Sequence, residues 1–292
     1  MMRAFGLAAG PMSSSWPDGL ERARDIVRRS DATTPSAALL RVEAEIRHGT
    51  ASAARLARLI EASPELAARV LRVANSGFYA PVQSVSTLPR AIAILGDALL
   101  RQLALASIAL ARRARNQSIQ QSVVAARFSG DAVRAAVICR ELARLTHRDQ
   151  EAAFAAGLLH DLGRLYLLDQ GRDAYAALAL ARRMEPTADD ERRVCGATHE
   201  EVGAILVANW SLPEPIGEVL RAHHAPRPGS LAELVGIADG LVAPLSRPAP
   251  IDTRMDDGPA SSLAMLGIEH SAWADGLPAV RDQIAELLQA FD

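Results

Sequence analysis

The chain of 292 residues contains no lysine, and all 32 of its basic residues are arginine. This absence excludes three kinds of active site: those built on a phosphate-binding P-loop lysine, a Schiff-base lysine or a lysine general base. Because alanine is also very abundant, we interpret the bias mainly as a base-composition signature of the source genome. The absence of lysine therefore excludes some reaction mechanisms but does not indicate which one the protein uses.

Cysteine is nearly absent as well, since the whole chain holds only Cys139 and Cys195. The two are far apart and neither belongs to a Cys-x-x-Cys pair, so the sequence suggests neither a redox motif nor a cysteine-based structural zinc site. Both lie beside apolar residues, and we interpret them as buried, reduced thiols on helices. Such thiols fit a cytosolic protein.

Long apolar runs are also missing, and none reaches the roughly 18 residues that a transmembrane helix needs. The apolar stretch at residues 4–9 is too short for the core of a signal peptide. We expect residues 1–15 to form a disordered tail. We expect a cytoplasmic location and no membrane partner.

The chain has no strong charge of either sign, because its formal net charge is −2. No global basic field therefore exists to attract nucleic acid or an anionic membrane. Arg101, Arg112, Arg113 and Arg115 form a local basic stretch, which a solvated helix face explains more simply than a nucleic-acid site. We expect no nucleic-acid partner.

Hydrophobic residues, by contrast, make up 49% of the chain and follow a helical spacing. They recur every three or four positions, as in the series Leu99, Leu103, Ala106 and Leu110. This is the period of an α-helix rather than a β-strand, and Ala, Leu, Arg and Glu are strong helix formers. The pattern predicts an all-α fold with a sizeable buried core.

Proline and glycine predict where individual helices begin and end. Pro64 is expected in the first turn of one helix, which stops after Asn75. The segment 78–86 is the best candidate for irregular structure. Pro89 is expected in the first turn of the next helix and Gly96 at its end.

These breaks predict five parts of the chain. They are a disordered tail (1–15), an N-terminal helical subdomain (16–115), a second helical subdomain (116–243), a linker loop rich in Pro, Gly and Asp (244–260), and C-terminal helices that pack back on the bundle (261–292).

Histidine is scarce, at seven residues, yet five of the seven lie between His147 and His224. Imidazole nitrogens and carboxylate oxygens are common ligands of divalent metals, and four local contexts supply them. The candidate metal ligands are His160, Asp161, His199, His223, His224 and Asp239. Arg164 lies one helical turn after His160, and its planar guanidinium would suit a phosphate.

Each context also has a structural explanation. A lone His160-Asp161 pair is more often structural than catalytic, and His199 could be solvated in the first turn of its helix. His223-His224 could simply interact with the dipole of a helix C-terminus. Asp239, inside an apolar run, could pair with an arginine. No context outweighs its structural explanation alone, but their order on successive helices indicates a shared site.

Two longer patterns frame these residues. The first runs from Ser63 to Ser76 and continues with Ser86, Ala91-Ile92 and Leu95-Gly96; the second runs from His199 through Val202-Gly203, Trp210, Leu212-Pro213 and Ile216 to His223-His224. With these two patterns together, the chain resembles the HDOD family over about residues 35–243. This family is the output-domain branch of the HD metal-dependent phosphohydrolase superfamily.

The resemblance implies an all-helical, multi-helix bundle of the HD/HDOD type with an N-terminal helical subdomain. It also implies a role in bacterial signal transduction, because HDOD proteins are usually regarded as regulatory output or interaction modules. Their HD-GYP relatives hydrolyse cyclic di-GMP at a metal centre.

Three departures from the active enzymes stand out against this resemblance. Phe128 stands where an active HD enzyme has a further histidine ligand. Arg164 replaces a lysine and stays charged, so it cannot shuttle a proton. After His224 the chain reads Ala225-Pro226, and the Gly-Tyr-Pro signature is absent.

We therefore expect a regulatory module that associates with another signalling or regulatory protein and has no hydrolase activity. No cofactor is firmly expected; if one is present, it is a divalent metal such as iron or manganese. The alternative is a metal-dependent phosphohydrolase acting on a cyclic dinucleotide or nucleotide, with Arg164 as its phosphate contact and a nucleotide second messenger as partner. The aromatic pair Phe78-Tyr79 would either contact a partner or pack under the helices.

Overall fold

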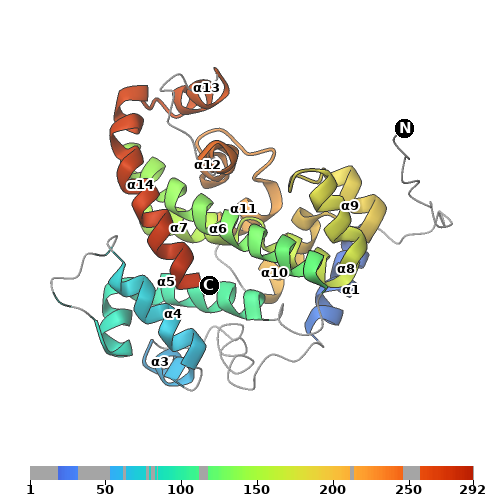
Figure 1. Cartoon of the computed structure of the whole chain (residues 1–292), viewed down its shortest axis with the longest axis horizontal. Helices are drawn as coiled ribbons and strands as arrows, with labels where there is room; N and C mark the ends of the chain where they lie inside the picture. The colour runs from blue at the N-terminus through green and yellow to red at the C-terminus, as the bar shows by residue number, and fades with distance from the viewer. Residues whose placement is uncertain are drawn as a thin grey trace.

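The structure is a computed structural model that describes residues 19–31, 53–61, 64–76, 79, 83, 85–111, 118–210, 214–245 and 257–291. These residues form α-helices joined by short turns, and no strand occurs among them (Figure 1). The all-α prediction is confirmed. The expected N-terminal tail, the basic residues after Ala111 and segment 246–256 of the expected linker lie outside the described residues.

Helices from the two halves of the chain occupy two regions of the molecule. The first half contributes α1 (Gly19–Asp31), α3 (Ala53–Glu61), α4 (Pro64–Asn75) and α5 (Leu88–Ala111). Helices α3, α4 and α5 pack on one another around buried side chains such as Leu56, Val70 and Leu99. Helix α1 instead packs against α8 and α10, as Figure 1 shows, so it belongs spatially with the second half.

The second half surrounds one long helix, α6 (Ile119–Leu145), with shorter ones. These are α7 (Gln150–Leu159), α8 (Leu162–Ala181), α9 (Ala188–Cys195), α10 (His199–Trp210), α11 (Glu214–Ala222) and α12 (Leu231–Leu245). Small residues bring α6 and α7 close together, since a Cβ on Gly157 would lie 2.8 Å from the Cα of Ala136. All of the helices that carry or adjoin the candidate ligands belong to this group.

The C-terminal segment joins the two regions. Helices α13 (Asp257–Met265) and α14 (His270–Phe291) end the chain, and α14 packs on both α6 and α4 (Figure 1). The indole of Trp273, on α14, is fully buried. No described helix is long and apolar enough to cross a membrane.

Local residues explain several of the helix ends. Asp149 caps α7 by accepting hydrogen bonds from the backbone N–H groups of Glu151 and Ala152. Thr187 and Asp190 form a reciprocal capping box at the start of α9. As predicted, α4 ends at Asn75, and its side-chain amide donates to the carbonyl oxygen of Val85 and so holds the following turn.

The predicted break at Gly96 is confirmed and gives a first testable result. Its backbone has φ 73° and ψ 161°, a conformation open almost only to glycine, and it divides α5. A Cβ there would meet no atom within 4 Å, so Gly96→Ala tests backbone strain alone. We expect a loss of about 1–3 kcal/mol in the free energy of unfolding, measured by urea denaturation.

Gly240→Ala is the matched control for this experiment. Gly240 also has open space around its Cβ position but lies in regular α12, so alanine there should preserve or raise stability. Equal stability of the Gly96→Ala variant and the unmodified chain would contradict the strain argument.

Candidate metal centre

The structure gathers all six predicted ligands at one end of the second helical region. His160 and Asp161 lie in the turn between α7 and α8, and His199 begins α10. His223 and His224 follow the last turn of α11, and Asp239 lies on α12. Five helices therefore supply side chains to one place, and the candidate ligands form two groups that share Asp161.

The first group consists of Asp161, His199, His223 and His224. Oδ1 of Asp161 lies 3.6 Å from Nε2 of His199 and 3.5 Å from Nε2 of His223, and the Nε2 atoms of His199 and His224 are 3.1 Å apart. Four ligands bound tetrahedrally at zinc–nitrogen distances would lie roughly 3.4 Å from one another. The spacing of the four donor atoms therefore suits a single divalent metal.

Buried atoms without hydrogen-bond partners support the same interpretation. Oδ1 of Asp161 and Nε2 of His223 are both buried and lack a partner. The Nδ1–H of His223 donates to the carbonyl oxygen of Val219 at 2.9 Å, so Nε2 is the nitrogen that faces the carboxylate. A buried nitrogen and a buried carboxylate oxygen that face each other without a hydrogen bond are costly unless a proton or a metal ion lies between them, so this donor set fits a metal.

Charge within the group also suits metal binding. Burial alone would raise the pKa of Asp161, but the Arg164 guanidinium and His160 hold it well below its usual range. Burial and the neighbouring imidazoles lower the pKa of His224 to about 4. At neutral pH the carboxylate is therefore ionised and the His224 ring is neutral, which are the protonation states that bind metals.

The second group is smaller and consists of His160, Asp161 and Asp239. Nε2 of His160 lies 3.6 Å from Oδ2 of Asp161 and 3.4 Å from Oδ1 of Asp239, and Nδ1–H donates to the Gly157 carbonyl oxygen. Although burial alone would lower the pKa of His160, the two carboxylates raise it to about 9. Three donor residues are available here, one fewer than in the first group.

Phe128 lies beside these donors on α6. Its ring is buried, and the guanidinium carbon of Arg164 lies 5.8 Å from the ring centre. Phe128 lines the same cavity as Asp161 and Asp239. Its correspondence to a histidine ligand of active HD enzymes stays a prediction. An aromatic ring offers no ligand atom, so α6 supplies no donor at this point.

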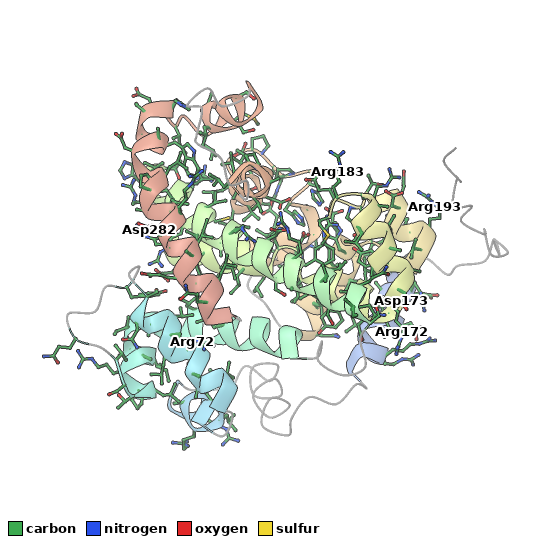
Figure 2. The ribbon with its side chains drawn as sticks, viewed as in Figure 1. Arg72, Arg172, Asp173, Arg183, Arg193 and Asp282 are labelled. Atoms are coloured by element: carbon green, nitrogen blue, oxygen red, sulfur yellow. The ribbon has the colours of Figure 1, made fainter. Side chains whose placement is uncertain are left out.

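A cavity of about 600 Å³ is lined by members of both groups: Asp161, His199, His224 and Asp239. Its walls come from α6, from the α8–α9 connection and from α12, and they include Arg127, Asp131, Met184, His224 and Val242. Arg183 and Met184 lie at its edge with positive φ angles of 53° and 76°, and Figure 2 labels Arg183 at the outer end of α8. The backbone N–H of Met184 donates to the carbonyl oxygen of Ala179 at 2.7 Å, so these angles belong to the hydrogen-bonded end of α8.

Arg164, the predicted phosphate contact, lies along the same wall but is engaged with protein groups. Its Nε donates to Oδ2 of Asp161 at 2.7 Å, and its Nη1 donates to Oε1 of Glu191 and to the carbonyl oxygen of Pro186, both at 3.3 Å. The side chain is buried. Its clearest role in the structure is to hold the Asp161 carboxylate in place.

Two glycines allow the ligand-bearing helices to approach closely, and sequence reasoning missed both. A Cβ on Gly163 would lie 2.1 Å from the carbonyl oxygen of His199, and one on Gly236 would lie 2.5 Å from that of His223. Only glycine fits where backbone meets backbone at such distances. A glycine inside an apolar helical run was the signal available in the sequence.

The sequence left open whether Tyr79 contacts a partner or packs under the helices, and the structure shows its position. Its hydroxyl donates to Oε2 of Glu151 at 3.0 Å, and the Arg140 guanidinium lies 4.9 Å from its ring centre. Tyr79 therefore packs inward against α6 and α7, which agrees with a cap under the helices. Phe78 lies outside the described residues.

Comparison with known proteins agrees with this architecture. A candidate phosphohydrolase from Shewanella amazonensis is 23% identical, with a TM-score of 0.66 over 91% of this chain and 98% of its own. A metal-dependent candidate phosphohydrolase from the same organism is 14% identical, with a TM-score of 0.63 over 93% and 98%. An HDOD domain protein of unknown function from Geobacter sulfurreducens is 22% identical, with a TM-score of 0.58 over 92% and 98%.

These structural similarities, all below 25% identity, establish a shared fold. No functionally curated protein matches the chain. The profile of the HDOD domain family matches residues 33–226, which is more than half of the sequence and includes five of the six candidate ligands. The chain therefore belongs to the HDOD domain family.

Proposed function

We propose that this protein is a regulatory module of bacterial signalling that binds one divalent metal as a structural element and does not hydrolyse phosphoesters. Its output is association with another signalling or regulatory protein in the cytoplasm. Membership of the HDOD family supports the regulatory role. The two cysteines are buried and free, which supports a reducing compartment.

The observation that carries the proposal is the number of protein ligands in the first group. Asp161, His199, His223 and His224 offer four donor atoms within 4.8 Å of one another. A tetrahedral metal held by four protein ligands has no open position for a water, and such closed sites are structural. These residues would hold zinc in this closed geometry, and the bound ion would cross-link the chain segments around α8, α10 and α11. Iron or manganese, which take more than four ligands, would keep open positions at the same donors.

The second donor group supports the same conclusion. A dinuclear hydrolytic centre requires a second metal held by enough protein ligands. The group around His160 and Asp239 offers three donor residues, and Phe128 fills the adjacent position on α6. Arg164 stays charged and is engaged with Asp161 and Glu191, so it offers no proton transfer to a leaving group.

Phosphohydrolase activity is the second candidate function, and one observation favours it. The cavity of about 600 Å³ is large enough for a small ligand and reaches donor atoms of both groups. A cyclic dinucleotide or a nucleotide would be the substrate class. If the metal takes a higher coordination number than four, it keeps open positions and can act as a Lewis acid towards a phosphoryl oxygen.

Metal stoichiometry and turnover separate the two functions. We expect the purified chain, loaded with zinc or manganese, to hold one metal per chain by mass spectrometry of the metal content. It should cleave cyclic di-GMP and bis(p-nitrophenyl) phosphate no faster than an Asp161→Asn variant. Two metals per chain together with turnover well above that of the variant would establish the hydrolase instead.

The variant Phe128→His sharpens this experiment. It would add a nitrogen donor beside His160 and Asp239, so a second metal should bind more tightly than in the unmodified chain. Unchanged binding would show that Phe128 does not occupy a ligand position.

A further inference from the structure

Glu191 on α9 is a buried carboxylate that the donor groups do not include. Its side chain is fully buried, and it lies eight residues before His199. A buried charge is costly unless it is compensated by hydrogen bonds. Glu191 accepts such bonds from three different residues, so its place in the structure is closely determined.

One oxygen of Glu191 holds His199 at two points. Oε2 accepts the backbone N–H of His199 at 2.8 Å and the ring Nδ1–H of the same residue at 2.7 Å. A carboxylate oxygen accepts only, so Nδ1 carries a proton and Nε2 is the nitrogen available to a metal. That nitrogen faces Oδ1 of Asp161 and Nε2 of His224.

The other oxygen ties Glu191 to the rest of the site. Oε1 accepts from the Tyr175 hydroxyl at 2.8 Å and from Nη1 of Arg164 at 3.3 Å. Arg164 in turn donates through Nε to Oδ2 of Asp161. One hydrogen-bonded network therefore orients two of the four donor residues, His199 directly and Asp161 through Arg164.

We propose that Glu191 is the positioning residue of the metal centre: by accepting both N–H groups of His199, it sets the ring tautomer and aims Nε2 at the metal position. A histidine that donates its second nitrogen to a carboxylate is oriented before the metal arrives and is also a stronger ligand. The proposal rests on the metal site of the proposed function, and it adds a residue that touches no metal.

The variant Glu191→Gln tests this role while keeping the size of the side chain. Loss of such an oriented carboxylate should weaken zinc or cobalt binding by about 10- to 100-fold, measured by competition with a chromophoric chelator. Tyr175→Phe is the matched control, because it removes a different buried bond to the same carboxylate and leaves the Glu191–His199 contact intact. It should reduce stability with a much smaller change in metal affinity.

A double-variant cycle separates positioning from general structural damage. In the His199→Ala background, Glu191→Gln should cause a much smaller further loss of metal affinity, because the residue that it orients directly is gone and only the indirect route through Arg164 to Asp161 is left. Equal losses in the two backgrounds would overturn the proposal.

Nitrogen-15 NMR of the imidazole rings gives a readout that does not need the metal. In the metal-free chain, His199 should be the Nδ1–H tautomer, and Glu191→Gln should alter the Nδ1 proton signal. An Nε2–H tautomer in the unmodified chain overturns the proposal even if the variant does not fold. If the unmodified chain binds no metal, the proposed function is wrong, and the NMR measurement still tests the contact between Glu191 and His199. If the unmodified chain binds metal and the Glu191→Gln variant binds it equally well, only the proposed role of Glu191 is wrong.

Discussion

Replacing His223 by alanine is expected to remove tight metal binding. Its side chain is almost completely buried, and Nε2 has no hydrogen-bond partner although it lies 3.5 Å from Oδ1 of Asp161. The variant deletes one of the four donors of the first group. Mutation of a residue that only orients a metal-ligating side chain typically lowers metal affinity by about 10- to 100-fold. We therefore expect loss of the metal-ligating side chain itself to lower the affinity by more than about 100-fold.

Thermal unfolding with and without zinc provides the measurement. A ligand that binds only the folded state stabilises it by about 4 kcal/mol at a concentration 1,000 times its dissociation constant. Zinc should therefore raise the unfolding temperature of the unmodified chain and leave that of His223→Ala almost unchanged.

His270→Ala is the matched control, because His270 is exposed at the start of α14 and belongs to neither donor group. It should respond to zinc as the unmodified chain does. A similar zinc shift in His223→Ala would show that the metal binds elsewhere or that three donors are sufficient, and the four-ligand centre would be wrong.

The second large effect is expected from Gly163→Ala, which adds a single methyl group. The new Cβ would lie 2.1 Å from the carbonyl oxygen of His199 and 2.8 Å from its Cα. Both contacts are with backbone, so no flexible side chain can move aside, and α8 and α10 would have to separate. Overpacking of this kind costs about 1–3 kcal/mol, and we expect the upper end of that range or more.

Separation of these helices should also affect the metal. His199 begins α10, and Asp161 directly precedes α8. If the two helices separate, His199 moves away from Asp161, so the affinity for zinc should fall together with the free energy of unfolding. Urea denaturation gives the free energy of unfolding and chelator competition gives the affinity.

Two other glycines provide the comparisons for Gly163→Ala. Gly236→Ala should behave similarly, because its Cβ would meet the carbonyl oxygen of His223 at 2.5 Å, whereas Gly240→Ala in open space should not. Near-native stability and zinc affinity in Gly163→Ala would refute the close approach of the two helices.

The sequence alone determined the helical class and many of the breaks between helices. The spacing of apolar residues, the end of α4 at Asn75 and the interruption at Gly96 depend on neighbours within one or two helical turns. Such local preferences can be read from a single chain. The order of the six polar residues along the chain was likewise visible, because each lies in a short recognisable stretch of sequence.

Only the tertiary structure decided which of the polar residues share a site and what surrounds them. The sequence gives no distance between His199 and Asp161, which are 38 positions apart, and it offered no motif around Glu191. Both depend on how α8, α9 and α10 cross, and that crossing depends on contacts such as Gly163 against the His199 backbone. Arg164 illustrates the same point, since its sequence position suited a phosphate while its folded position joins Asp161 to Glu191. Helix formation is a local property of the chain, whereas a metal centre exists only where helices distant in sequence are packed together.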